Sequence, residues 1–498
     1  MLRAAVVAAV AALVLSGCSA TPGGGGGDGS EAALLRVVML GSENETLDYG
    51  SAQSYFPWTV IGNACDSLVV TRDGAIVDSL AETIVPNADA TEWIVTIRDG
   101  VTFHNGTALT AEDVVASIRY FAASPGFGTY YSVVDLDGLT AVDARTVRVP
   151  LTAPRADFVD TVLGSASVVF EAGEGTAEMP SCSGPFRLES FDQDTGAVLL
   201  RHEGYWGERA LLERLEIRRV ADPAARVNAL VSGEADYAFD IPSTGAATVG
   251  GVEGLQVMTG GVANSGAMYF VLNTRVAPFD DPAVRRALTQ VVNREQLVSV
   301  VLGEYGQLGN DLFGKGLEGY DGSIAQRTQD LDAARATLAA AGVTALDATV
   351  AELTPGLRDA TELLGQQLAE VGVQLTIDEI DPSSFFTDLD RLYSSQIISM
   401  YGLNRPVVVT LPQLFGAENP YAFSGWNPPQ FTTLVEQMQQ TVDDSARQAV
   451  LDQIQQLQWE QGGYLVWGYR EQISAARAGL AGVRANVGYP VFAQAGFR

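Results

Sequence analysis

Positive charge is scarce in this chain of 498 residues. Thirty lysine and arginine residues stand against sixty aspartates and glutamates, which gives a formal net charge of −30, and Lys315 is the single lysine. Nucleic-acid binding depends on basic patches that neutralise phosphates. The charge balance therefore argues against a nucleic-acid partner and suits a soluble, exported protein.

Histidine and cysteine, the residues that most often carry chemistry, are also few. The two histidines, His104 and His202, and the three cysteines do not have the spacing of a zinc site. The sequence contains neither a G-x-S-x-G elbow nor an H-E-x-x-H motif. We therefore expect no metal, no cofactor and no catalytic residue, with a secreted hydrolase as a remote alternative. His104, beside Asn105-Gly106, is interpreted as a structural hydrogen-bonding residue.

Long apolar runs are missing apart from residues 4–15, which are too short for a membrane span of ~20 residues. This run follows Arg3 and ends in Leu-Ser-Gly-Cys18, which resembles the cleavage box of a bacterial lipoprotein. We expect residues 1–17 to be a signal peptide and Cys18 to carry lipid; an ordinary secretory signal is the alternative. Residues 18–34 include five consecutive glycines and are expected to form a flexible tether.

Beyond Cys18, the chain has only Cys65 and Cys182. An even pair in an oxidising compartment favours a disulfide, and two buried free thiols are the alternative.

The rest of the chain alternates strand and helix patterns, and its apolar content of 47% is enough for a sizeable core. Residues 181–242 show the pattern best. Asp222-Pro223 opens a helix that Gly233 ends, and short alternating strands lie on both sides of it. A second strand–helix–strand rhythm in residues 331–380 predicts another α/β lobe.

Four segments resemble the signature of the extracellular solute-binding proteins of the peptide/nickel type (family 5), which serve ABC importers. They are SGPFRLESF with the EGYWG and DPAARVNALVSGEADYA that follow it, residues 80–121, residues 268–303 and the Ser-Gly-Trp-Asn stretch at 424–427. The resemblance implies an α/β fold with two lobes, of the type II periplasmic-binding-protein class, with an extra subdomain inserted in the first lobe. It assigns residues 35–60, 163–272 and 470–498 to lobe I, 61–162 to the inserted subdomain and 273–469 to lobe II, with a hinge at 273–278.

The resemblance also places the ligand between the lobes, where loops at the carboxyl ends of strands line the crevice. The candidates come from the loop after the first strand, from an aromatic stretch at 54–66, from the end of the strand at 397–401 and from the stretch at 424–427. The aromatic candidates are equally compatible with a cleft wall and with the core. The predicted ligand contacts are Ser42, Glu43, Asn44, Tyr55, Tyr401, Gly402, Asn404 and Trp426.

These observations predict a lipid-anchored, monomeric receptor on the outer face of the cell membrane. It would capture an oligopeptide or peptide-like solute between two closing lobes and present it to the permease subunits of an ABC transporter. Peptide-binding members of the resembled family hold the peptide amine with an acidic residue, but no Asp or Glu occurs between Asp390 and Glu418 here. A nickel chelate or another non-peptide solute therefore stays open, as does an adhesion or signalling receptor.

Overall fold

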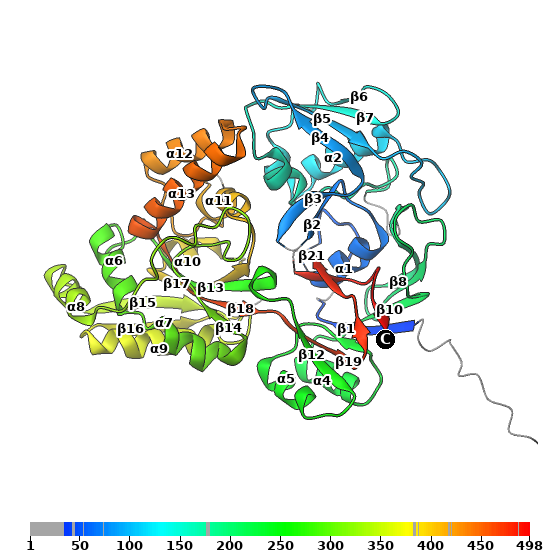
Figure 1. The fold of residues 1–498 in the computed structure, drawn as a ribbon. Helices are drawn as coiled ribbons and strands as arrows, with labels where there is room; N and C mark the ends of the chain where they lie inside the picture. Colours follow the sequence, from blue (N-terminus) through cyan, green and yellow to red (C-terminus); the bar gives the residue numbers. More distant parts are fainter. Residues whose placement is uncertain are drawn as a thin grey trace, which may run out of the picture.

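The computed structural model describes residues 34–41, 45–52, 54–72, 74–175, 180–381, 385–386, 388–416, 419, 421–486 and 488–498. These residues form two lobes, each built on its own mixed sheet (Figure 1). The predicted α/β class with two lobes is therefore confirmed. No helix within these residues has both the length and the apolar character that crossing a membrane requires. Cys18, nearly all of the predicted tether and the candidates at 42–44 lie outside the described residues.

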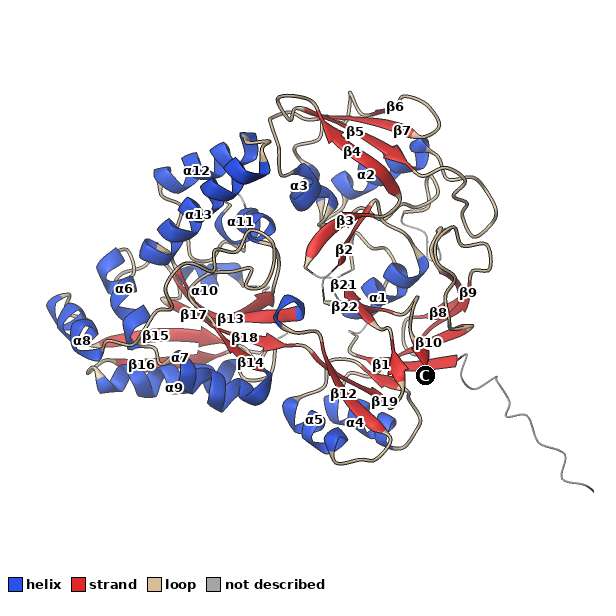
Figure 2. Cartoon of the chain, viewed as in Figure 1, coloured by secondary structure: helices blue, strands red, loops and turns tan. Residues whose placement is uncertain are grey.

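Lobe I is built on seven strands in the order β12-β19-β11-β1-β10-β9-β8. β1 is parallel to β10 and β11, and the other pairs in the sheet are antiparallel. Adjacent residues of β1 point to opposite faces, so Val37 joins the core under α1 and Val38 joins the core under α4 and α5 (Figure 2). The strands are β1 Leu34–Met39, β8 Phe186–Asp192, β9 Gly196–Arg201, β10 Arg214–Arg219, β11 Tyr237–Ala238, β12 Leu255–Thr259 and β19 Ile473–Arg477, with the short pairs β20 Leu480–Ala481 and β23 Gly496–Phe497, and β21 Arg484–Asn486 and β22 Tyr489–Val491; the helices are α1 Tyr55–Ala64, α4 Pro223–Val231 and α5 Ser243–Gly250.

The inserted subdomain adds a four-stranded sheet in the order β4-β5-β7-β6 and a β2–β3 hairpin. Helix α2 begins with a capping box, in which Asp113 Oδ2 accepts a hydrogen bond from the backbone N–H of Thr110 at 2.8 Å. The buried side chains of the subdomain belong to the same cluster as those under α1, so the subdomain is part of the core of lobe I. Its elements are β2 Val69–Arg72, β3 Ala75–Asp78, β4 Ala81–Pro86, β5 Glu92–Ile97, β6 Thr140–Ala141, β7 Thr146–Pro150, α2 Ala111–Ala123, α3 Gly128–Tyr131 and a π-helical turn, η2, Val159–Leu163.

Lobe II is a sheet between two helical layers, with strand order β14-β18-β13-β17-β15-β16. Strand β13 faces both layers. Met268, Phe270 and Leu272 pack under α6, α8 and α9, while Tyr269 and Val271 pack under α11, α12 and α13. The strands are β13 Ser265–Leu272, β14 Gly306–Leu308, β15 Ala345–Val350, β16 Gln374–Glu379, β17 Ile397–Leu403 and β18 Tyr464–Glu471; the helices are α6 Pro282–Val291, α7 Arg294–Leu297, η4 Val298–Leu302, η5 Gly303–Tyr305, α8 Leu331–Ala340, α9 Leu357–Glu370, α10 Leu389–Ser394, α11 Val407–Phe415, α12 Pro429–Gln440 and α13 Asp444–Gln461.

The boundary between the lobes differs from the expected one. Strand β13, which was assigned to lobe I, pairs with β17 and β18 of lobe II. The described chain therefore passes between the lobes at residues 260–264, which include the turn η3 (Val262–Asn264), and again at Gln472. The expected hinge at 273–278 begins inside lobe II, where Asn273 is fully buried. A buried apolar strand has the same pattern in either sheet, so its sequence does not show which sheet it joins.

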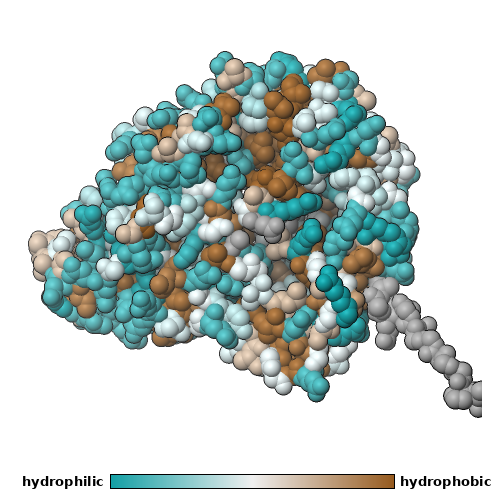
Figure 3. Space-filling model, in the orientation of Figure 1, coloured by the Kyte–Doolittle hydropathy of each residue, from teal (hydrophilic) through white to brown (hydrophobic). Residues whose placement is uncertain are grey.

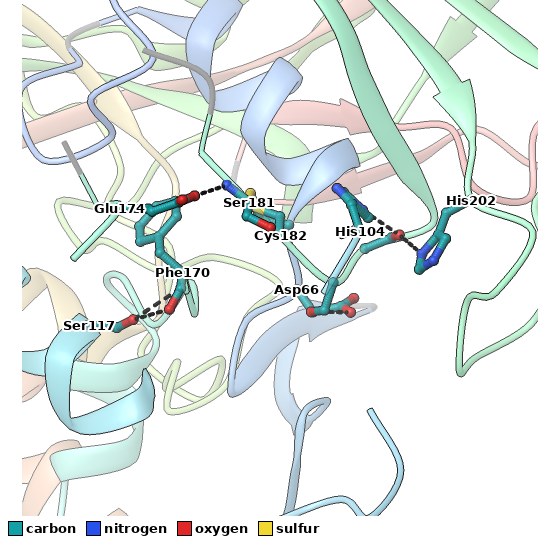
Figure 4. Close-up of a disulfide and its surroundings, with 11 residues drawn as sticks. Asp66, His104, Ser117, Phe170, Glu174, Ser181, Cys182 and His202 are labelled. Atoms are coloured by element: carbon teal, nitrogen blue, oxygen red, sulfur yellow. Dashed lines mark hydrogen bonds between the residues drawn. A yellow bond between two sulfur atoms is a disulfide. The ribbon is translucent and has the colours of Figure 1, made fainter. Parts of the chain in front are cut away.

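The structure joins Cys65 and Cys182 in a disulfide, with 4.7 Å between the Cα atoms. The bond links the end of α1 to the segment that leads into β8 (Figure 4). Beside it, Asp66 is buried and accepts hydrogen bonds from Ser183, Tyr205 and Trp206. Burial raises the pKa of Asp66, and these hydrogen bonds oppose the rise.

Candidate functional site

The lobes meet along a cleft that contains two small cavities. The larger cavity, about 90 Å³, is lined by α1 and residues 163–167 of lobe I and by the segment between β17 and α11 of lobe II. The smaller cavity, about 30 Å³, shares Leu403 with it. Such volumes hold a few water molecules or one functional group. The two lobes are therefore closed on each other in this structure. On the face of the molecule shown in Figure 3, apolar residues lie along the boundary between the inserted subdomain and lobe II.

Two pairs of side chains bridge the lobes at the smaller cavity. The side chains of Tyr55 on α1 and Tyr401 on β17 form a hydrogen bond. Asp240 of lobe I faces Arg470 of lobe II, with 3.4 Å between Oδ1 and Nη2. Burial raises the pKa of both tyrosines, so both hydroxyl groups stay protonated. The smaller cavity therefore offers hydrogen-bonding groups next to a pair of opposite charges that compensate each other.

The larger cavity has a different character. Among the described residues that line it, Arg405 is the only charged one. Hydroxyl groups come from lobe I, on Tyr49, Ser67, Thr71, Ser165, Ser167 and Tyr489. Burial raises the pKa of Tyr49 to about 12, while a hydrogen bond with Tyr489 and the charge of Arg405 lower it. The indole Nε1 of Trp58 is buried and has no hydrogen-bond acceptor among the described residues. This cavity therefore presents donors and one positive charge.

Three of the predicted ligand contacts lie at or beside the smaller cavity. Tyr55 and Tyr401 line it. Gly402 follows Tyr401 in β17, and a Cβ atom on Gly402 would lie 3.4 Å from the hydroxyl oxygen of Tyr269. The strand end chosen from the sequence is thus at the interface of the lobes.

Two other predicted contacts, Asn404 and Trp426, lie in the interior of lobe II. Asn404 is 7% exposed, and its Nδ2 donates to the backbone carbonyls of Val262 and Lys315, each at 2.8 Å. Trp426 is 4% exposed and packs edge-on against Phe431, with 4.9 Å between ring centroids. For Trp426 the structure supports the core alternative.

Sequence reasoning missed four residues of the cleft. Arg405 directly follows the candidate Asn404, and its cationic side chain at the carboxyl end of a strand was the available signal. Trp58 belongs to the aromatic stretch that supplied Tyr55. Asp240 and Arg470 are 230 residues apart, and no local pattern could have shown that two different sheets bring them together.

Both histidines serve the structure of lobe I. His104 Nε2 and His202 Nδ1 each lie 3.1 Å from the carbonyl oxygen of Gly184 (Figure 4). Burial lowers the pKa of His104 to about 4, so the ring is neutral at pH 7. Among the described residues, no three His, Cys, Asp or Glu side chains lie close enough together to hold a metal ion.

The chain is similar to known proteins in both sequence and structure. The profile described as "Bacterial extracellular solute-binding proteins, family 5 Middle" matches residues 75–416. The glutathione-binding protein GsiB of Salmonella typhimurium is 26% identical over 434 residues, which cover 82% of each chain. Among solved structures, DppA from Helicobacter pylori in complex with the peptide STSA has a TM-score of 0.76 at 19% identity, covering 93% of this chain and 98% of its own. NikA from Staphylococcus aureus in complex with Ni(L-His)2 has a TM-score of 0.76 at 17% identity, covering 94% and 100%.

Proposed function

Because the chain belongs to the family 5 bacterial extracellular solute-binding proteins, it is a substrate-binding protein of the ABC-transporter type and not an enzyme, and we propose that it is a lipid-anchored, monomeric receptor for a peptide or peptide-like solute. The solute binds between the lobes, and the closed form docks on the permease subunits at the outer face of the cell membrane. Cys18 carries the lipid, and the glycine-rich segment after it lets the folded part stand away from the membrane.

The observation that carries this proposal is the pair of contacts between Tyr55 and Tyr401 and between Asp240 and Arg470. Each contact takes one side chain from each lobe, so opening the cleft breaks both. A solute that binds groups of both lobes stabilises the closed state by its differential affinity for that state. The proposed contacts with the solute are Tyr55, Tyr401 and the backbone of Gly402. Residues 42–44, which come shortly after β1 in the sequence, are proposed as further contacts.

The chemistry of the solute follows from what the cleft contains. Asp240, the acidic residue that lines the smaller cavity, already faces Arg470. Among the described residues that line the two cavities, no unpaired carboxylate is available to hold a free peptide amine. A solute with peptide-like amide groups fits the hydroxyl groups of the two tyrosines, and a chelate or another small solute is the alternative that the experiment below separates.

The test is capture of the natural solute. The full chain with Cys18→Ser is produced with a tag, incubated with an extract of rich growth medium, washed and denatured, and the released compounds are identified by mass spectrometry. Peptides or peptide-like compounds are expected. Recovery of a metal chelate instead would replace the peptide part of the proposal, and recovery of nothing from several extracts would count against solute capture.

Anchoring has its own readout. The native chain, expressed in a host that processes lipoproteins, should be found in the membrane fraction and should incorporate labelled palmitate, and the Cys18→Ser chain should do neither. A native chain that is released without label would identify the leader as an ordinary secretory signal.

A further inference from the structure

The larger cavity carries a positive charge that none of the described residues lining the cavity balances. Arg405 lies in the segment between β17 and α11, and no Asp or Glu is among the described residues that line this cavity. In a chain with a formal net charge of −30, such a cavity is an exception. A cleft with low-dielectric walls and charge of one sign concentrates counter-ions of the opposite sign.

The guanidinium group of Arg405 also has no partner within the described part of the chain. No carboxylate lies within ion-pair distance of it and its side chain makes no hydrogen bond there, whereas Arg294, Arg327 and Arg470 of the same lobe are paired with aspartates. Its charge still acts inside the cavity, because it lowers the pKa of Tyr49 against the larger effect of burial. A partly buried charge without a partner costs stability, so its presence calls for another reason.

A second donor without an acceptor lies in the same cavity. The Nε1 atom of Trp58 is buried and has no hydrogen-bond partner among the described residues. Most buried polar groups of folded proteins find a partner, so the unsatisfied Nε1 of Trp58 is unexpected, and the unpaired guanidinium group of Arg405 belongs to the same cavity. They come from different lobes, Trp58 from α1 of lobe I and Arg405 from lobe II. Both would be satisfied by one acceptor group lying between the lobes.

We infer that the solute carries an anionic group, a carboxylate or a similar oxyanion, that binds in the larger cavity to Arg405 and Trp58. This inference rests on the proposed function and adds to it the charge of the solute and the end of the cleft where that charge lies. The planar guanidinium can bind both oxygens of a carboxylate, and the indole N–H can donate to one of them. The cavity holds the anionic group and not the whole solute, whose remainder extends towards Tyr55 and Tyr401.

The adjacent smaller cavity explains why the two arginines of the cleft differ. Arg470 faces Asp240 and is neutralised before any solute arrives. Arg405 is not, so an anion gains a charge-assisted hydrogen bond at Arg405 without displacing a carboxylate of the protein. Net attraction for an anion is therefore expected at the larger cavity.

The experiment uses two sets of probes and three variants of the full chain with Cys18→Ser. The first probe set is an equimolar tripeptide library, presented once as free acids and once as C-terminal amides. The second is the medium extract, whose captured compounds are sorted by net charge. The variants are Arg405→Gln, Arg405→Lys and, as a matched control, Arg358→Gln. Arg358 lies on the exposed face of α9 and pairs with Glu362 and Glu379.

The expected result is that the parent chain binds acids at least ~10-fold more tightly than amides, the size of one charge-assisted interaction. Arg405→Gln should lose this preference, Arg405→Lys should keep part of it and Arg358→Gln should keep all of it. The melting temperature of unliganded Arg405→Gln should stay within about 2 °C of the parent, because no partner is lost.

Other results would overturn the inference, or would leave the decision to the compounds captured from the medium extract. Equal binding of acids and amides, or an acid preference that survives Arg405→Gln, overturns it and leaves solute capture intact. If neither library binds, the peptide part of the proposed function fails. The extract then decides: capture of anionic compounds that is lost in Arg405→Gln supports the inference, and capture of neutral or cationic ones overturns it. Capture of nothing overturns both. A drop in the unliganded melting temperature of more than about 5 °C in Arg405→Gln would identify Arg405 as a structural residue.

Discussion

Tyr401 and Trp426 are both aromatic residues of lobe II, but they lie in different environments. Tyr401 lies near the end of β17, at the surface that meets lobe I, and shares a hydrogen bond with Tyr55. Trp426 packs against Phe415 and Phe431 with only 4% of its surface exposed. Aromatic side chains of lobe II therefore lie at the interface of the lobes in one place and in the core in the other, and substitutions test whether the two differ in role.

Trp426→Ala should destabilise the protein by about 3–5 kcal/mol, because it removes a large buried ring and leaves a cavity. Equilibrium unfolding in urea measures this loss. Tyr421→Ala is the control, since Tyr421 is 50% exposed and its removal should change the stability by less than about 1 kcal/mol. Tyr401→Ala should lie near the control in stability while it weakens solute binding. A Trp426→Ala variant that stays stable but binds the solute more weakly would show that Trp426 belongs to the wall of the cleft and not to the core.

His104 should make the stability of the protein depend on pH below neutrality. Its folded pKa is about 4, below the ordinary value of 6.5, because burial disfavours the charged ring. A depressed folded pKa means that the stabilisation is present above pH 6.5 and is lost as the pH falls from 6.5 to 4. One pKa unit corresponds to about 1.4 kcal/mol, so a shift from 6.5 to about 4 limits the loss to at most about 3–4 kcal/mol.

The measurement compares unfolding free energies of the parent and His104→Gln between pH 7.5 and 4.5. Gln offers an N–H for the Gly184 carbonyl but does not titrate, so the variant should lose less stability per pH unit. Both proteins should have the same slope above pH 7, where the histidine is neutral in either state. Parallel curves over the whole range would show that His104 does not contribute.

Helix ends in this chain are determined by short local motifs. Asp222 accepts a hydrogen bond from the first turn of α4 at 2.6 Å, as the Asp222-Pro223 pair predicted, and Asp281, which also precedes a proline, does the same for α6 at 2.8 Å. Such ends could be predicted because cap and helix are neighbours in the sequence. The sequence could not show that β13 belongs to the sheet of lobe II or that Asp240 pairs with Arg470. Both depend on the order of strands in the sheets, which local sequence patterns do not contain. The strand near Tyr401 could be predicted from its local pattern. The larger cavity around Arg405 could not, because it is formed by segments of both lobes that lie far apart in the sequence.

The disulfide is expected to stabilise lobe I. It links α1 to the segment before β8 across a sequence separation of 117 residues, and in the chain-entropy model a loop of this length is worth up to about 5 kcal/mol. The double variant Cys65→Ala/Cys182→Ala should therefore have a free energy of unfolding that is about 2–5 kcal/mol lower, and it should unfold at a lower urea concentration. Reduction with dithiothreitol should destabilise the parent by a similar amount and leave the variant unchanged. Equal midpoints for parent and variant would show that the bond adds nothing to stability.

The described chain passes between the lobes at two places that lie side by side, and the proposed opening of the cleft would bend these two connections. Asn264 and Gln472, one from each crossing, are joined by a hydrogen bond between their side chains and by one between their backbones. Two paired connections of this kind can bend together while each lobe keeps its own sheet. Outside the cleft, the closed state is held by contacts such as the one from the backbone N–H of Ala156 to the carbonyl of Gln439, at 2.6 Å.

Asp160 should make this closure depend on pH. It lies in η2 of lobe I, near Glu318, Asp444 and Arg447 of lobe II. Burial and repulsion by Glu318 raise its pKa from 3.8 to about 7, with smaller contributions from Asp157 and Asp444, and Arg447 opposes the rise. Opening exposes the carboxylate to water and moves it away from Glu318, so its pKa falls in the open state. The closed state thus binds the proton more tightly, and closure is favoured at low pH and weakened as the pH rises through 7.

The change that tests this is Asp160→Asn, which keeps the shape of the side chain and removes its charge. Spin labels on an exposed site of each lobe report the distance between them at pH 5.5 and pH 8. In the parent the population of separated lobes should grow at pH 8, by an amount that corresponds to about 1–2 kcal/mol after solvent screening. In Asp160→Asn the distances should stay the same at both pH values, and Glu318→Gln should reduce the response, because repulsion by Glu318 is the second cause. A pH response of full size in Asp160→Asn would mean that other groups control closure.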